Sequence, residues 1–166
     1  IAAASEIINT LLKFFKKFKE YYPKLHIQGK DIEVIKELII SINNIIDRFG
    51  EVRNDASPEL FQIRKKIQSV RSKIGQSFQR ALSQYNTADY LDDIKESVVD
   101  NRRVLAVKAM HRRKIKGAIM GSSKTGSIVY IEPETTLQHS RELNNLQFEE
   151  TNEIKRILLE LTQTLQ

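Results

Sequence analysis

The chain has no cysteine and no tryptophan, and it holds only three prolines and six glycines among its 166 residues. Without cysteine it forms no disulfide, uses no thiolate as a nucleophile and offers no thiolate to a metal, which fits a reducing compartment. No apolar run approaches the ~18 residues that span a bilayer. The start of the chain shows neither a basic leader nor a small-residue cleavage site. We therefore expect a cytoplasmic protein with no membrane partner.

Acidic residues are missing from one stretch of the chain. Between Asn101 and Ile131 there are eight basic residues and no Asp or Glu, whereas the other 135 residues hold 19 basic and 21 acidic residues. Mixed charge is the usual pattern of a solvated surface, and unmixed positive charge is the natural complement of phosphate. We predict that these residues contact a nucleic-acid backbone without reading its bases. They are Arg102, Arg103, Lys108, Arg112, Arg113, Lys114, Lys116 and Lys124.

Apolar residues at helical spacing predict two helices in the first part of the chain. The first covers 5–22 and is ended by Pro23. The second is capped by Asp31 and stops near Gly50. Together they supply the apolar stripes of a helical body.

A third helix has a stronger signal, because Ser57 is a good N-cap and Pro58 suits the first helical position. Its heptad seam predicts a rod that runs to about Tyr85. A last helix of the same period is predicted from Pro133 to Gln166. Two such helices are expected to pair in antiparallel fashion.

Short runs rich in Val and Ile lie between these two helices, at 104–109, 115–120 and 127–131, and 97–99 is a candidate fourth strand. They predict a three-stranded antiparallel meander. The expected fold is therefore mainly α, with long antiparallel helices and a small antiparallel β meander at their tip. We divide the chain into a helical region (1–92), a small β module (93–133) and a returning helix (134–166).

Other motifs give little support for chemistry. The GSSKTG sequence at 121–126 lacks the glycine spacing of a phosphate loop and is better interpreted as a hairpin turn. The three histidines stand in unrelated contexts, so neither a metal site nor a catalytic triad is predicted. Glu132 and Glu134 beside Pro133 are interpreted as negative charge at a helix N-terminus. We predict no catalytic, cofactor-binding or metal-binding residue.

Three stretches occur in order along the chain: FGEVRNDASPELFQIRKKI at 49–67, RRVLAVKAMHRRKIKG at 102–117 and SSKTGSIVYIEP at 122–133. The most specific parts are 51–60 and 122–133, and a Glu-rich heptad helix follows them. Together these stretches resemble the lever and clamp region of the bacterial MutS type-two family, MutS-like ATPases of DNA mismatch repair and anti-recombination. The resemblance covers essentially the whole chain, and it implies a helical lever region at 1–92, a β clamp module at 93–133 and a returning lever helix at 134–166.

For a full-length protein the resemblance implies a homodimeric ATPase that uses ATP and Mg²⁺ and binds duplex or branched DNA. It also implies suppression of recombination and, in some members, the splitting of collided ribosomes; many members end in a Smr nuclease domain. The ATPase and Smr motifs do not occur in these residues. The chain begins with Ile1 rather than Met, so we expect a non-catalytic piece of a longer protein, without a cofactor of its own.

The chain departs from the family at two places. Met120 and Gly121 stand where relatives often show a His-Asp pair, and Ser140 and Arg141 stand where they often show paired Asn. The choice between DNA and ribosomal RNA is therefore left open. A second function of a different class is also left open: a structural coiled-coil arm that mediates dimerisation or transmits motion, with a basic tip that is only solvated.

Overall fold

The computed structural model describes residues 2–32 and 36–164, and the chain forms two compact units. We call the first the helical unit; it contains Ile1–Phe61 and Asn152–Gln166. We call the second the sheet unit; it contains Gln62–Thr151. The three regions predicted from the sequence, 1–92, 93–133 and 134–166, are consecutive along the chain. Their roles as lever, clamp and returning lever stay a prediction.

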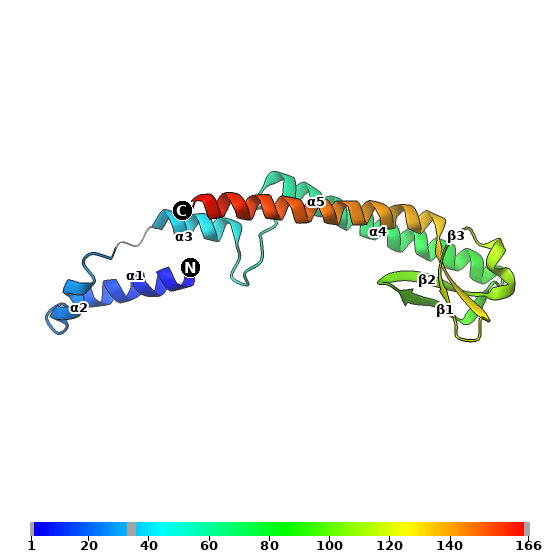
Figure 1. Ribbon diagram of the computed structural model, residues 1–166, viewed down its shortest axis with the longest axis horizontal. Coiled ribbons are helices and arrows are strands. Elements are labelled where there is room, and N and C mark those ends of the chain that lie inside the picture. The colour runs from blue at the N-terminus through cyan, green and yellow to red at the C-terminus, as the bar shows by residue number, and fades with distance from the viewer. Residues whose placement is uncertain (1, 33–35, 165–166) are drawn as a thin grey trace. The chain divides into compact units, whose positions relative to one another are not determined.

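The protein is mainly α-helical with one small antiparallel sheet, as predicted (Figure 1). No described helix is both long enough and apolar enough to cross a membrane. The elements follow in the order α1 (Ala2–Lys17), α2 (Pro23–Gln28), α3 (Lys36–Ile45), α4 (Pro58–Thr87), β1 (Leu91–Val99), β2 (Arg102–Lys108), the 3₁₀ helix η1 (Ala109–Lys114), β3 (Gly117–Ser122), β4 (Ile128–Pro133) and α5 (Glu134–Thr164).

The first predicted helix is wrong at its end. The α1 helix stops at Lys17, and Pro23 begins α2 instead of ending a helix. Proline suits a first helical position because its missing N–H has no intrahelical partner there. The predicted start of the second helix falls at 31–35, and 33–35 lie outside the described residues. The described part of this helix, α3, begins at Lys36 and ends at Ile45, before the turn at Gly50.

The predicted start of α4 is confirmed. The Leu60 amide donates a hydrogen bond to Ser57 Oγ at 3.0 Å, and Pro58 is the first helical residue. In the helical unit Ser57 also donates to Glu153 Oε1 at 2.6 Å, and Arg156 donates to both oxygens of the same carboxylate. The Arg156 guanidinium and then the Ser57 hydroxyl lower the pKa of Glu153 from its usual 4.5 to about 2.

This carboxylate predicts an acid-sensitive part of the stability. A lowered folded-state pKa means that ionised Glu153 stabilises the fold above about pH 5, and that this contribution is lost as pH falls towards 2. Glu153→Gln is expected to lower the free energy of unfolding by about 1–2 kcal/mol at pH 7 and to have little effect near pH 2. Thermal melts at both pH values measure the difference, with Glu149→Gln, an exposed change on the same helix, as the control. A Glu153→Gln difference independent of pH would contradict the assignment.

The sheet has the strand order β1-β2-β4-β3, with every pair antiparallel. The predicted meander is therefore wrong in its pairing, because β2 pairs with β4 and not with β3. The η1 segment leads the chain away from β2, and β3 then pairs with the other side of β4. The candidate fourth strand is real but longer than predicted, since β1 begins at Leu91. Its polar residues and register shift hide a strand pattern, as is common for edge strands.

The sheet packs on the last turns of α4. Phe78 and Ala81 of α4 form a buried cluster with Leu105, Val107 and Ile131 of the two central strands. Ile115, which follows η1, belongs to the same cluster, so η1 is anchored at its end. The sheet and its 3₁₀ helix are thus held to α4 by one apolar core.

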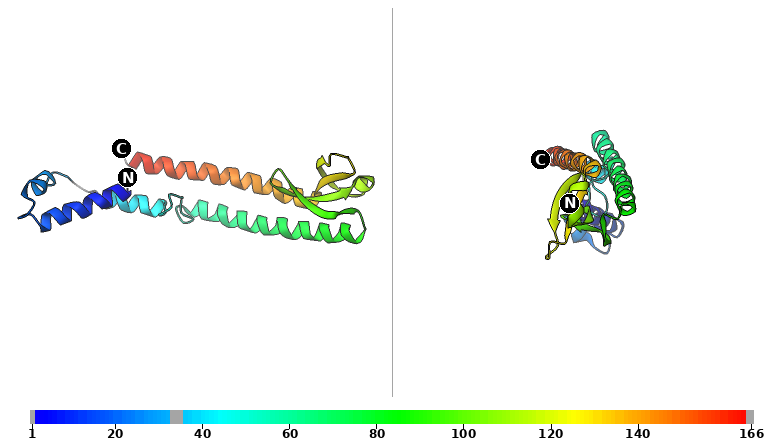
Figure 2. Two further views of the ribbon diagram at one scale, coloured as in Figure 1. Left: turned by 90° about the horizontal axis from the view of Figure 1, so that it is seen from below. Right: turned by 90° about the vertical axis from the view of Figure 1, so that its right-hand side faces the viewer.

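Within the sheet unit α4 and α5 lie side by side and run in opposite directions (Figure 2). Ile67 and Val70 of α4 are buried against Leu146 of α5. Beside this contact, Arg64 Nε donates to Glu150 Oε1 at 2.7 Å. The antiparallel helical pair predicted from the heptad seams is therefore present here. Pro133 ends β4, so α5 begins one residue later than predicted, and Gln166 lies outside the described residues.

Candidate nucleic-acid interface

All eight predicted basic residues belong to the sheet unit. Arg102, Arg103 and Lys108 are on β2, and Arg112, Arg113 and Lys114 are the last three residues of η1. Lys116 precedes β3, and Lys124 is in the turn between β3 and β4. The fold therefore distributes them over four local positions.

The three basic residues on β2 each have an acidic partner. Arg102 Nη1 lies 3.0 Å from Glu132 Oε2, Arg103 Nη2 lies 2.6 Å from Glu96 Oε2, and Lys108 Nζ lies 2.8 Å from Asp89 Oδ1. The Lys108 ammonium also lowers the pKa of the Asp89 carboxyl. Each pairing neutralises a positive charge of the basic stretch. The sequence did not reveal these pairs, because the acidic partners lie outside the stretch between Asn101 and Ile131.

The Arg102 pairing is mostly hidden from water. Glu132 is almost fully buried, and its second oxygen accepts a hydrogen bond from Ser140 of α5 at 2.6 Å. The interpretation of Glu132 as helix N-terminal charge is therefore wrong, because its side chain links β2, β4 and α5. Glu134 does occupy the first turn of α5, as predicted.

The other five basic residues are exposed: Arg112, Arg113, Lys114, Lys116 and Lys124. Among residues 2–32 and 36–164, no carboxylate lies within 4.0 Å of any of them, in contrast to the pairs formed by β2. Exposed cations that no carboxylate neutralises keep their charge available to an incoming polyanion. These five are the candidate interface, and we call them the free basic set.

Three members of the free basic set are consecutive in the chain. Arg112, Arg113 and Lys114 close η1, and a 3₁₀ helix turns successive side chains by about 120°. The buried Ile115 follows at once and ties this end of η1 to the core. The three charges are therefore presented from a short anchored segment.

Lys124 and Lys116 lie at different ends of the β3–β4 hairpin. The Ala109 amide donates to the Ser127 carbonyl at 2.9 Å, which places the start of η1 beside the end of the turn that carries Lys124. The Lys116 carbonyl accepts from the Glu134 amide at 3.0 Å, so Lys116 lies where α5 begins. The 121–126 segment contains the end of β3 and most of the turn that leads to β4, so the predicted hairpin turn is present, with Gly126 at φ +72°.

Aromatic side chains accompany the basic η1 segment, which sequence reasoning missed. The His111 ring stacks on Tyr90 with 4.8 Å between centroids, and Tyr90 in turn stacks on Tyr85 at 6.4 Å. The Lys114 ammonium lies 4.9 Å from the Tyr90 centroid. The sequence analysis did not include Tyr85 and Tyr90 because both lie outside the basic stretch between Asn101 and Ile131. The sequence feature that could have revealed them is the pair formed by Tyr85, near the end of α4, and Tyr90, directly before β1.

The three histidines are far apart in the chain, on α2, η1 and α5. In the part of the chain that the structure describes, no three His, Asp or Glu side chains gather in a way that suits a metal ion. The candidate site therefore presents positive charge beside aromatic side chains.

The sheet unit defines a class of protein: an antiparallel helical pair that carries a small antiparallel sheet with a basic 3₁₀ segment. No family model matches the chain. It is 32% identical to a protein named Endonuclease MutS2 from Pelotomaculum thermopropionicum over 93% of its length, and 34% identical to one from Leuconostoc mesenteroides over 84%. A third, from Alkaliphilus oremlandii, is 31% identical over 96% of the chain.

The chain belongs to the MutS type-two family, as its sequence motifs indicated. It spans about one fifth of the length of the curated relatives that it matches: 20%, 17% and 20% of the three proteins.

Proposed function

We propose that this chain is the lever and clamp segment of a MutS type-two protein and that it grips the phosphate backbone of nucleic acid. The observation that carries the proposal is the free basic set, in particular the three consecutive cations of η1. Phosphates supply the negative charge that these exposed side chains lack in the fold. The ligand is duplex or branched DNA, or structured ribosomal RNA.

The division of the eight basic residues suggests two roles. The pairs formed by Arg102, Arg103 and Lys108 stabilise the sheet and its contact with the helices. Arg112, Arg113 and Lys114, with Lys116 and Lys124, contact phosphate. This division narrows the sequence prediction from eight ligand-binding residues to five.

The helices give the clamp its mechanical role. Ile67, Val70 and Leu146 hold α4 and α5 together in the sheet unit, so a displacement of this helical pair carries the sheet with it. In a full-length protein, an ATPase elsewhere in the chain, working with ATP and Mg²⁺ in a homodimer, would drive that displacement. The described residues hold the polymer and leave the hydrolysis to other parts of the protein.

A structural arm is the competing function, and the paired cations of β2 favour it. Three of the eight charges already have partners, and the heptad seam of α4 and α5 is buried. Under this alternative the chain mediates dimerisation or transmits motion without touching nucleic acid. The η1 cations would then only be solvated.

Salt dependence distinguishes the two functions. We expect the chain to bind a fluorescein-labelled DNA duplex weakly, and the affinity to fall steeply between about 50 and 200 mM salt because condensed counterions are released. Fluorescence anisotropy measures this, with a single strand and a structured RNA of equal length as further ligands. Equal binding at low and high salt, or no binding at low salt, would support the structural arm.

A further inference from the structure

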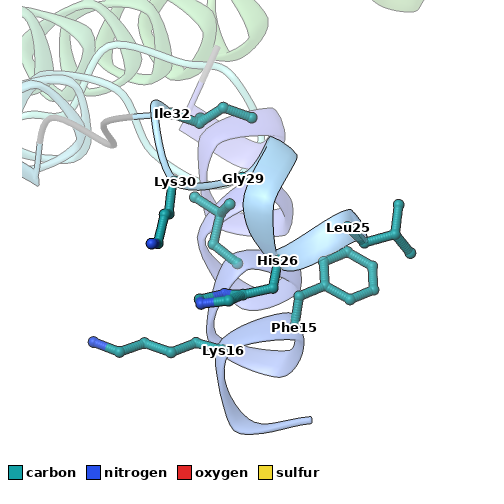
Figure 3. A pocket seen from close by; sticks show the side chains of 8 residues that line it. Phe15, Lys16, Leu25, His26, Gly29, Lys30 and Ile32 are labelled. Atoms are coloured by element: carbon teal, nitrogen blue, oxygen red, sulfur yellow. The ribbon is translucent and has the colours of Figure 1, made fainter. Parts of the chain in front are cut away.

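A cavity of about 450 Å³ lies in the helical unit between α1 and α2 (Figure 3). Its volume is within the range of small-molecule sites. The proposed clamp function makes no use of it, because its residues all lie between Leu12 and Ile32.

One part of the cavity wall is apolar. Leu12 and Phe15 come from α1, and Leu25 comes from α2. Gly29 follows α2 and lies so close to α1 that a Cβ atom there would be 2.7 Å from Leu12 Cδ2. The absence of a side chain at Gly29 therefore lets the end of α2 approach α1, and this approach shapes the cavity.

The polar part of the wall is basic among the described residues. There it consists of Lys16, His26 and Lys30. Figure 3 shows the nitrogen atoms of these three side chains on one side of the cavity, with Phe15 and Leu25 on the other. No ion pair within 4.0 Å involves Lys16 or Lys30 among residues 2–32 and 36–164, although Asp31 is the next residue after Lys30. The cavity thus has separate apolar and cationic sides.

We propose that this cavity binds a small amphiphilic phosphomonoester, with its apolar body against Phe15 and Leu25 and its phosphate beside Lys16, His26 and Lys30. Lysine binds phosphate as a point charge on a flexible stem, and an imidazole N–H can also donate a hydrogen bond, so two lysines and a histidine suit a group with several acceptor oxygens. A phosphomonoester carries about −1.5 to −2 charge at pH 7, more than a carboxylate. The ligand is either a free small molecule or the headgroup region of an anionic lipid.

Titration of the ¹⁵N-labelled chain with monomeric octyl phosphate tests the proposal. We expect the Gly29 amide signal to shift, with an affinity at least tenfold higher for octyl phosphate than for octyl glucoside or inorganic phosphate. Equal binding of octyl phosphate and octyl glucoside would overturn the proposal, because it would show an apolar surface without anion recognition. Binding of inorganic phosphate as tightly as octyl phosphate would overturn the role of the apolar wall.

Two double variants distinguish binding in this cavity from a general effect of the protein's positive charge. Lys16→Gln with Lys30→Gln is expected to weaken octyl phosphate binding at least tenfold, whereas Lys13→Gln with Lys19→Gln, exposed lysines outside the cavity, should change it less than twofold. An equal loss in both variants would overturn the site. Vesicles of phosphatidylcholine with and without phosphatidic acid distinguish the two sources of the ligand. Vesicle binding without any binding of monomeric octyl phosphate would also overturn it.

Discussion

Reversing the charge of Arg112, Arg113 and Lys114 by substitution with Glu is expected to reduce duplex binding about 100-fold or more. The three side chains are exposed and belong to the free basic set. A charge-assisted contact contributes about 1.5–3 kcal/mol at best and less when exposed, so the loss of three contacts amounts to several kcal/mol. Fluorescence anisotropy at about 0.1 M salt measures the change. The stability of the sheet should change little, because none of the three is in the buried core.

A second triple variant serves as the control for total charge. Lys65→Glu, Lys66→Glu and Lys73→Glu change the net charge by the same amount and lie exposed on α4. We expect this control to weaken binding less than tenfold, through the general field of the protein. If both variants lose affinity equally, η1 is not the contact surface. If neither loses affinity, the chain is a structural arm.

Phe78→Ala is expected to destabilise the sheet unit by about 3–5 kcal/mol. Phe78 is fully buried at the centre of the cluster that joins α4 to the sheet. Its removal leaves a cavity of the kind that costs this much in other cores. The Arg103 guanidinium, 4.3 Å from the ring centroid, loses its aromatic partner as well. In a chain of this size, a thermal melt is expected to show a decrease of about 10 °C in melting temperature.

Phe61→Ala is the matched control for Phe78→Ala. It removes the same side chain from the same helix, but Phe61 is 49% exposed. We expect a loss of less than about 1 kcal/mol from this exposed position. If the two variants melt at the same temperature, the cluster around Phe78 does not hold the sheet. Urea unfolding of both variants provides the free energies that decide the comparison.

The fold was predictable where local chemistry determines it. Ser57 and Pro58 fixed the start of α4, and the spacing of Ile67 and Val70 predicted its buried seam. Strand order was not predictable, because the choice of β4 over β3 as the partner of β2 depends on a 3₁₀ segment whose sequence resembles a turn. The end of α1 was missed because apolar spacing continues through Phe18 after the helix has stopped.

The sequence indicated the candidate site only in outline. The gap in acidic residues marked a basic segment, and this segment lies in the sheet unit. It could not show which charges are paired, since Glu96, Glu132 and Asp89 come from other parts of the chain. Tertiary contacts also bring Tyr90 to His111 across some twenty residues of sequence. Pairing of this kind is set by strand register, which local patterns do not encode.

Buried Glu132 shows how the fold satisfies a carboxylate away from water. Ser140 donates a hydrogen bond to Oε1 of the Glu132 carboxylate, and Arg102 donates to Oε2. Both partners are needed because a buried carboxylate without them would be costly. Ser140 and Arg102 therefore help to hold α5, β2 and β4 together, and neither belongs to the free basic set.

The most direct test of nucleic-acid binding by η1 is the slope of log Kd against log salt concentration, measured side by side for the chain and for the Arg112, Arg113 and Lys114 charge-reversal variant. Each neutralised phosphate contributes about 0.9 to the magnitude of the slope for duplex DNA. If all five cations of the free basic set engage, the magnitude reaches about 4.5, and the variant should lower it by about 2.7. Equal slopes for the two proteins would contradict the assignment of η1 as the contact surface.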